Sequence, residues 1–235
     1  LHDTYYDRAL DIVNAFADFF KSTFSNVQQS QSLHSPDDRA TSSCIYLANN
    51  VTESDVLEGI KRLKNNKAAG VDQVPSFLVK DCSGVLVKPL RHIINLIIQY
   101  TYWPEMWKTS KIIPMFKSGD SSNISNYRPI SLLCNFSKIL EYIIYHQFYF
   151  QVKCNLSPFQ HGFSVGRSTN TNLVCMSQHI AETLDNKGQL DVIYTDLSKA
   201  FDKVDHPILL NKLSVWLVKL YVKPFHFLSV FSHQL

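Results

Sequence analysis

A carboxylate at the end of an alternating apolar run is the first candidate for chemistry. In residues 191–196, DVIYTD, the side chains of Val192, Tyr194 and Asp196 would share one face of a strand. An ionised carboxylate in line with a buried face carries a large free-energy cost unless a cation or hydrogen bonds satisfy it. A divalent metal ion is one such partner, so Asp196 is a candidate metal ligand. The alternative, which the spacing leaves open, is that Asp196 only caps the helix predicted to follow it.

Basic side chains gather between residues 108 and 128. This segment holds four basic residues, Lys108, Lys111, Lys117 and Arg128, against the single acid Asp120. Lys117 and Arg128 flank a loop rich in Ser, Asn and Gly, so two cations could converge on one group of phosphates. The alternative is an ordinary solvated turn with surface charges.

A second loop, QHGFSVGRSTN at residues 160–170, carries two glycines and Arg167 before a helix start rich in Ser, Thr and Asn. Backbone N–H groups at such a helix start can contact an anion. No lysine follows the second glycine, so the loop is not a Walker phosphate-binding loop. The nine histidines show no His-x-x-x-His spacing and therefore do not predict a metal site.

Composition bounds the class of protein. The chain has 235 residues, 45% of them hydrophobic, and a net charge of +3, so it can bury a core. The charge is compatible with a polyanionic partner but too small to demonstrate one. Five scattered cysteines without a Cys-x-x-Cys pair indicate a reducing, intracellular compartment, the nucleus or the cytoplasm. We expect no secretory signal, and no membrane span, because Lys219 and Lys223 interrupt the apolar C-terminal stretch.

The elements that must position these residues are mostly helices. Periodic apolar positions and capping signals predict helices over residues 4–24, 52–70, 83–100, 135–148 and 169–184. Thr52 and Asp55 form a capping-box pattern at the second of these, and Pro89 is expected in the first turn of the third. A strand, a long turn and a second strand are predicted over 111–133, and a further strand over 190–196.

Five segments, taken in order, carry a resemblance to a known family. They are NNKAAGVDQVPSFLVK, IIPMFKSGD, NYRPISLLCNFSKILEYIIYHQF, LSPFQHGFSVGRSTN and YTDLSKAFDKVDHPILLNKL. Over about residues 50–213 the chain closely resembles the reverse transcriptase of non-LTR, LINE-like and jockey-type retrotransposons. The resemblance implies an RNA-directed DNA polymerase whose partners are an RNA template, a DNA primer and deoxynucleoside triphosphates.

The resemblance also implies an α+β, helix-rich fold. It would contain the fingers of a right-hand polymerase and the beginning of the palm, truncated before the remaining palm strands. The implied boundaries are an N-terminal helical extension at 1–24, a linker at 25–50, a fingers-like region at 51–189, the first palm strand with its helix at 190–213, and a divergent tail at 214–235.

The family's functional residues map onto positions of this sequence. Asp196 matches the first catalytic aspartate, which would hold Mg²⁺ or Mn²⁺ together with the backbone carbonyl of Leu197. Lys117 and Arg128 match the cations that grip the triphosphate of the incoming nucleotide. Phe201 matches the bulky side chain that excludes a ribose 2′-hydroxyl. The residues that match the template and nucleotide pocket are Gln160, Gly162, Phe163, Gly166 and Arg167.

The family's remaining carboxylates are not found after Asp196 in this sequence. A Pro-Gln-Gly segment and an Ala-Asp-Asp hairpin would be expected there, whereas the only adjacent aspartates, Asp37 and Asp38, lie upstream in a polar linker. Because Mg²⁺ prefers octahedral oxygen ligation and binds a single carboxylate weakly, we expect the metal to bind weakly or not at all and the chain alone to be inactive.

Two other functions remain open at this point. One is a non-catalytic, nucleic-acid-binding remnant of such an element, held to backbone phosphates by its basic segment. The other is an α-rich domain in which Asp196 does no more than cap a helix.

Overall fold

The computed structural model describes residues 6–24, 50–65, 67–153, 156–197, 204–205 and 207–209. The chain divides into two units. The hairpin unit comprises Leu1–Tyr149 with Phe201–Leu235, and the α7 unit comprises Phe150–Ala200. Phe201, the tail predicted at 214–235 and all but the last residue of the linker predicted at 25–50 lie outside the described residues.

The first core helix of the hairpin unit, α2 (Glu53–Arg62), begins at the predicted capping box. The Thr52 side chain accepts a hydrogen bond from the Asp55 backbone N–H, and the Asp55 carboxylate accepts one from the Thr52 N–H at 2.8 Å. Just before the cap, the side-chain amide of Asn95, in α4 (Ser83–Tyr100), accepts a hydrogen bond from the Val51 N–H at 2.7 Å and donates one to the Val51 carbonyl at 3.0 Å. These contacts satisfy backbone groups that a helix start leaves open and fix α2 against α4.

Helices α3 (Ser76–Asp81) and α4 (Ser83–Tyr100) follow almost without a break. The prediction that Pro89 lies in the first turn of its helix is wrong, because α4 begins at Ser83 and Pro89 is inside it. The Cys82 carbonyl accepts from the N–H groups of both Val85 and Leu86 and starts the helix earlier. An interior proline removes one backbone hydrogen bond, and the buried apolar face of α4 offsets that loss.

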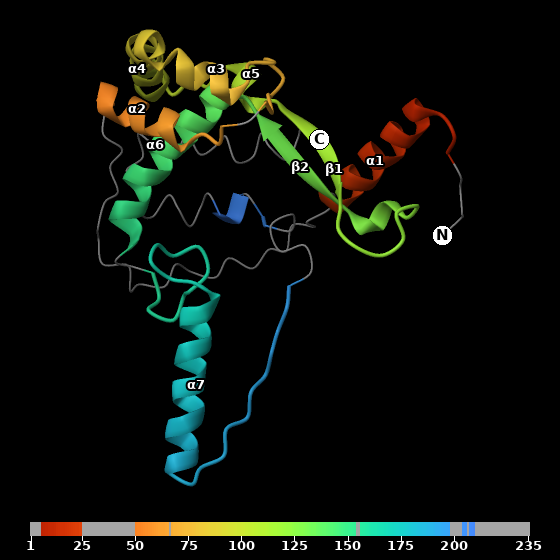
Figure 1. Cartoon of the computed structure of the whole chain (residues 1–235), viewed down its shortest axis with the longest axis vertical. Helices are drawn as coiled ribbons and strands as arrows, with labels where there is room; N and C mark the ends of the chain where they lie inside the picture. The colour runs from red at the N-terminus through yellow and green to blue at the C-terminus, as the bar shows by residue number, and fades with distance from the viewer. Residues whose placement is uncertain are drawn as a thin grey trace. The chain divides into compact units, whose positions relative to one another are not determined.

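Helix α6 (Asn135–Val152) completes the core. Ile139, Leu140 and Ile143 of this helix are buried, and Gly59 of α2 lies so close that a Cβ there would be 2.9 Å from Ile139 Cγ2. Figure 1 shows α2, α3, α4 and α6 grouped at one end of the hairpin unit. The other apolar side chains that are buried in this core include Val51, Val56, Ile60, Val79, Leu90, Ile94, Ile97 and Ile98.

A two-stranded antiparallel hairpin extends from this helical core (Figure 1). Strands β1 (Ser110–Phe116) and β2 (Tyr127–Leu133) confirm the predicted strand, turn and strand, in a register that runs from Ser110 opposite Leu133 to Phe116 opposite Tyr127. Pro114 and Pro129 lie directly opposite each other. The Lys117 N–H donates a hydrogen bond to the Asn126 carbonyl, and hydrogen-bonded pairs alternate along an antiparallel ladder. Pro114 and Pro129 therefore form a pair that is not hydrogen-bonded, so the ladder does not need the N–H groups that proline lacks.

Two short helices flank the strands. Helix α5 (Glu105–Lys108) precedes β1, and the buried Ser137 of α6 donates a hydrogen bond to its Trp107 carbonyl at 3.0 Å. The 3₁₀ turn η1 (Ile124–Asn126) precedes β2. The N-terminal helix α1 (Ala9–Phe24) contacts η1 beside the far end of the hairpin (Figure 1).

The α7 unit contains one long helix, a loop of successive turns before it and a segment without regular secondary structure after it. Helix α7 (Thr169–Asp185) confirms the prediction for 169–184, and Ser168 and Thr171 form a second capping box at its start. None of its residues is buried. Among the described helices of the whole chain, none combines the length and the apolar character needed to cross a membrane.

The predicted strand at 190–196 is not observed. Residues 189–197 have no regular secondary structure, and Val192 and Tyr194, which were predicted to face a core, are 42% and 86% exposed. An alternating pattern states which side chains would share a face, but a strand also needs a hydrogen-bonded neighbour. Among the described residues, only β1 and β2 pair with each other.

Candidate nucleic-acid interface

One face of the hairpin carries the two cations that the sequence singled out. Arg128 lies directly opposite Met115, and the Lys117 N–H continues the register by donating to the Asn126 carbonyl at 2.9 Å. Lys117 is therefore on the same face as Arg128 and is its diagonal neighbour, at a separation of roughly 7–8 Å between backbone positions. Both residues are exposed, and neither side chain has an ion-pair or hydrogen-bond partner among the described residues. The pair is available to bind an anion.

The loop between these cations is held by its own hydrogen bonds. Gly119 adopts φ +95°, a left-handed conformation that glycine takes without strain, and a Cβ there would meet Asn126 Nδ2 at 2.8 Å. Asn126 Nδ2 donates to the Asp120 carbonyl at 2.9 Å, and the Asp120 carboxylate accepts from the Ser122 N–H at 2.9 Å. Hydrogen bonds from the backbone and the side chain of Ser122 to this carboxylate lower the pKa of Asp120. The only acid of the loop is thus engaged within the loop, and it forms no ion pair with Lys117.

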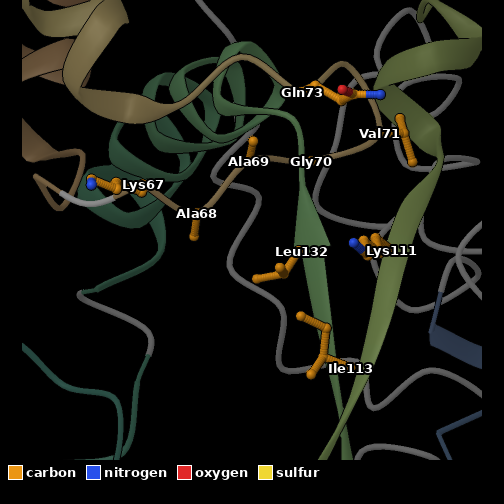
Figure 2. A pocket seen from close by; sticks show the side chains of 9 residues that line it. All are labelled: Lys67, Ala68, Ala69, Gly70, Val71, Gln73, Lys111, Ile113 and Leu132. Atoms are coloured by element: carbon orange, nitrogen blue, oxygen red, sulfur yellow. The ribbon is translucent and has the colours of Figure 1, made fainter.

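A cavity of about 670 Å³ lies at the other end of the same hairpin face. Figure 2 shows the 67–73 segment on one side of it and the two strands on the other. Two amines, one side-chain amide, small residues and apolar side chains line it, namely Lys67, Ala68, Ala69, Gly70, Val71, Gln73, Lys111, Ile113 and Leu132. Lys111 is paired with Leu132, so the alternation of the strands places the cavity and the Lys117–Arg128 pair on one continuous face.

The distance along this face has a chemical meaning. Lys111 and Lys117 are six residues apart in an extended segment, which spans about 20 Å. Single-stranded nucleic acids are bound by grooves that combine cations for the backbone with apolar surface for the bases. The face offers both, since the exposed Ile113 and Met115 lie between the two lysines. We call the face formed by Lys111, Ile113, Met115, Lys117 and Arg128 the basic face.

The 67–73 segment is anchored where β2 meets α6. A Cβ at Gly70 would lie 2.5 Å from the Cys134 N and 2.7 Å from its Cα, so only glycine fits. Gln73 takes φ +57°, and its N–H donates to the Gly70 carbonyl at 3.2 Å to close the turn. Asn135 Nδ2 then donates to the Val74 carbonyl at 2.7 Å. The approach of Gly70 to Cys134 and the Asn135–Val74 hydrogen bond join residues more than sixty positions apart and fix the 67–73 segment beside the strands.

Burial at this junction affects one thiol. Cys134 is fully buried, and its burial, together with the neighbouring Asp72 carboxylate, raises the pKa of the thiol. The Asp72 Oδ1 accepts from the Val74 N–H at 3.3 Å, whereas its Oδ2 is buried without a hydrogen-bond partner among the described residues. The Asp72 carboxylate thus stabilises the turn, and Asp72 is not one of the residues that line the cavity.

The residues predicted for the template and nucleotide pocket come together in one loop of the α7 unit. Gln160 Nε2 donates to the Gly162 carbonyl at 3.0 Å, and the Arg167 guanidinium donates to the carbonyls of Pro158 and Gln160. Phe163, with φ +58°, is 85% exposed, and Gly166 has φ +77°. The loop is therefore closed internally by Arg167 and projects Phe163 outward.

The helix start after this loop is already capped. Ser168 accepts from the Thr171 N–H, and the Thr171 hydroxyl oxygen accepts from the Ser168 N–H at 2.9 Å. The Thr171 Oγ1 also lies 2.9 Å from His161 Nδ1. Two of the donors that the predicted anion contact needed are thus engaged within the chain.

Asp196 and Leu197 lie at the end of the described part of the α7 unit, and both are exposed. Within the described residues, no three His, Cys, Asp or Glu side chains gather in a way that could hold a metal ion. These residues alone therefore do not form a Mg²⁺ site, and the role of Asp196 as its first ligand stays a prediction. Whether Asp196 instead caps a helix concerns residues 198–203, which lie outside the described part of the chain.

The sequence indicated Lys111 as part of the basic segment at 108–128, but it predicted neither the cavity nor the place of Lys67 beside it. Lys67 and Lys111 are far apart in the chain, and neither belongs to a motif with a fixed spacing. The available signal was the run Lys67-Ala-Ala-Gly70, whose small residues leave room beside a cation. The meaning of this run depends on the fold, which brings it beside Ile113 and Leu132 to line one cavity.

Comparison with known proteins bears on these segments. A family model described as "Reverse transcriptase (RNA-dependent DNA polymerase)" matches residues 116–231. The matched range begins at the last residue of β1, so it includes Lys117, Arg128, the loop of Gln160 and Asp196.

Curated relatives are similar over a longer part of the chain. It is 30% identical over 175 residues to the "Probable RNA-directed DNA polymerase from transposon BS" of Drosophila melanogaster, which covers 73% of this chain and 19% of that relative. It is 30% identical over 165 residues to the "RNA-directed DNA polymerase from mobile element jockey" of the same species, which covers 69% of this chain and 18% of the relative. The jockey polymerase of Drosophila funebris is 31% identical over 168 residues, which covers 70% and 18%.

The chain thus spans about a fifth of the length of these curated relatives. The match to the family model and the similarity to several transposon polymerases agree with the order of the motifs in the sequence. This chain belongs to the reverse transcriptase family of non-LTR, jockey-like retrotransposons.

Proposed function

We propose that this chain provides the fingers of an RNA-directed DNA polymerase, and that Lys117 and Arg128 bind the triphosphate of the incoming deoxynucleotide. The observation that carries the proposal is the shared hairpin face on which both cations are exposed without a partner among the described residues. Guanidinium and ammonium groups that converge on phosphate oxygens are the usual way to bind a triphosphate. Their freedom from internal ion pairs means that binding breaks no existing salt bridge.

The basic face also supports contact with a nucleic-acid strand. Lys111 and Lys67 can neutralise backbone phosphates, and Ile113 can pack against a base. In this proposal the RNA template lies along the cavity, while the nucleotide lies at the Lys117 end. The same face would serve the alternative function, a non-catalytic binder of nucleic acid, which needs the lysines but no chemistry.

Asp196 is proposed as one ligand of the family's divalent metal. A bound Mg²⁺ activates a primer hydroxyl and neutralises charge on the triphosphate in such polymerases. Because one carboxylate is too few for octahedral ligation, and the described residues add no second one, we derive no catalytic step for this chain. A polypeptide of these 235 residues is expected to bind nucleotide without extending a primer.

The first test measures binding of deoxythymidine triphosphate to the 235-residue chain by fluorescence anisotropy of a labelled analogue. Lys117→Ala together with Arg128→Ala should weaken binding by about a hundredfold or more, since charge-assisted hydrogen bonds contribute roughly 1.5–3 kcal/mol each and two are removed. The matched control is Lys88→Ala with Arg91→Ala, which removes the same charges from exposed positions of α4. Equal weakening by both double variants would overturn the proposed nucleotide site.

The second test separates the enzyme from the simple binder. Primer extension on primed poly(rA) with Mn²⁺ should give no product for the chain alone. Product that disappears on Asp196→Asn would contradict the expected inactivity. Binding of single-stranded RNA that falls on Lys67→Ala and Lys111→Ala, and that weakens steeply with salt, supports the strand contact in either function.

A further inference from the structure

An aromatic cluster joins the N-terminal helix to the tip of the hairpin. The Phe16 ring of α1 meets the Tyr127 ring edge-on, with centroids 4.9 Å apart and an interplanar angle of 75°. On α1, Phe20 lies 5.8 Å from Phe16 and 5.7 Å from Phe19, and Phe20 is only 3% exposed. On the hairpin, Phe116 lies 5.4 Å from Tyr127. We call Phe16, Phe19, Phe20, Phe116 and Tyr127 the aromatic clamp.

Tyr127 connects three elements within this clamp. Its ring contacts α1 through Phe16 and β1 through Phe116, while its hydroxyl donates to the Ser121 carbonyl at 2.8 Å. The Ser121 carbonyl belongs to the loop that begins at Lys117. One side chain therefore fixes the helix, the last pair of the ladder and the loop at the same time.

The clamp lies on the opposite face of the hairpin from the two cations. Phe116 and Tyr127 are the last cross-strand pair, and successive residues of a strand point to opposite faces. Lys117 follows Phe116 in the chain, and Arg128 follows Tyr127. The aromatic clamp thus contains the residue that precedes each cation in the chain, and its rings lie on the face of the hairpin opposite the cations.

A hairpin of two strands needs such support. Isolated two-stranded hairpins are marginally stable in water, and the tip of β1 and β2 is at the end of the hairpin that points away from the helical core (Figure 1). A loop that must be ordered when a ligand binds loses affinity, because part of the binding free energy is spent on ordering. A brace on the far face removes that cost before the ligand arrives.

We propose that α1 is a brace for the nucleotide site, in which Phe16 and Tyr127 are positioning residues that hold Lys117 and Arg128 in the geometry for a triphosphate. The inference rests on the proposed function of these two cations. It adds a regulatory consequence: any displacement of α1 from the hairpin weakens nucleotide binding although α1 never touches the nucleotide.

The test uses the whole 235-residue chain and labelled deoxythymidine triphosphate. Phe16→Ala should weaken binding by about three- to tenfold, the range expected from one aromatic pair. Phe16→Tyr retains the ring and should bind within about twofold of the parent, as should the control Val13→Ala, which changes a 62% exposed position of the same helix. A Phe16→Ala protein that binds like the parent overturns the brace.

Two further measurements distinguish positioning from general damage. Amide hydrogen exchange in residues 117–126 should accelerate in Phe16→Ala while exchange in α4 stays unchanged; equal acceleration in both would overturn the brace. In a Lys117→Ala, Arg128→Ala background, Phe16→Ala should weaken binding no further, because it acts only through these cations. A full additional loss there would also overturn it.

The outcomes separate the brace from the function on which it depends. If the double cation variant binds the nucleotide like the parent, the proposed nucleotide site fails and the brace of that site fails with it. If the cation variant loses binding but Phe16→Ala does not, the nucleotide site stands and the brace alone is rejected. Phe16→Leu serves in place of Phe16→Ala should the alanine protein lack a cooperative thermal transition.

Discussion

The hairpin unit and the α7 unit show two different ways of placing residues that could do chemistry. In the hairpin unit, Lys117 and Arg128 lie on a defined ladder that is tied to a buried core of helices. In the α7 unit, no residue of α7 is buried, and the loop of Gln160 is closed by its own hydrogen bonds. Tertiary packing thus fixes Lys117 and Arg128, whereas hydrogen bonds between residues close in sequence shape the loop of Gln160.

The basic face and the segment of Asp196 differ in how much their geometry says about function. The strand register, the cavity and the contact with α1 fix where the cations of the basic face lie, so the ligands proposed for it follow from the positions of its residues. Asp196 has a strong sequence signal, yet its segment lacks a neighbouring strand among the described residues.

The largest expected effect comes from emptying the core. Ile139 is fully buried and packs against Gly59, so Ile139→Ala should lower the free energy of unfolding by about 4 kcal/mol. Leu173→Ala, on the exposed surface of α7, should change it by less than about 0.5 kcal/mol. Urea denaturation followed by tryptophan fluorescence measures both. Similar losses for the two variants would abolish the contrast between the units.

A half-buried carboxyl in the hairpin unit, that of Glu141, should make stability depend on pH. Burial raises the pKa of Glu141 from 4.5 to about 7, although Lys138 opposes this. As pH rises from 4.5 to 7, the unfolded chain releases the proton first, so the stability that is present below pH 4.5 is progressively lost. Glu141→Gln should remove this loss and stabilise the protein at pH 8 by up to about 3 kcal/mol.

Urea titrations at pH 5 and pH 8 measure this effect. Lys138→Met is the companion variant, because removal of the opposing cation should deepen the loss of stability at pH 8. A Glu141→Gln protein with the same pH dependence as the parent would show that this carboxyl is not the source.

Two glycines contrast a steric constraint with a conformational one. Gly70→Ala forces a Cβ to within 2.5 Å of the Cys134 backbone and should cost about 2 kcal/mol while loosening the cavity. Gly166→Ala meets no neighbour within 4 Å and carries only the strain of φ +77°, which costs about 1 kcal/mol and stays within its loop. Denaturation and regional hydrogen exchange distinguish them. A larger effect at Gly166 would argue against this assignment.

The two capping boxes give the smallest contrast. Thr52→Ala and Ser168→Ala each remove one N-cap, which is worth about 1 kcal/mol to the helix it starts. Thr52→Ala should lower the global stability, because α2 belongs to the core. Ser168→Ala should only increase hydrogen exchange in the first turn of α7. Global destabilisation by Ser168→Ala would mean that α7 is part of the same cooperative unit.

Local signals in the sequence predicted several elements correctly. The Thr52–Asp55 capping box, the helix predicted over 135–148 and the hairpin predicted over 111–133 are all confirmed. Each depends on residues a few positions apart, where the chemistry of caps, turns and helical periodicity is decided. The family was likewise evident from the order of its motifs.

Other features depended on residues that are distant in sequence. The sequence placed Pro89 in a first turn and residues 190–196 in a strand, and both predictions were wrong. A helix start depends on which carbonyl is free to accept, and a strand exists only with a partner to complete its hydrogen bonds. Residue type and order therefore determined the family and the candidate cations of this protein. Tertiary structure alone decided that Lys117 and Arg128 share a face with a cavity and that Phe16 supports them from behind, because such contacts follow from packing between segments and from no local pattern.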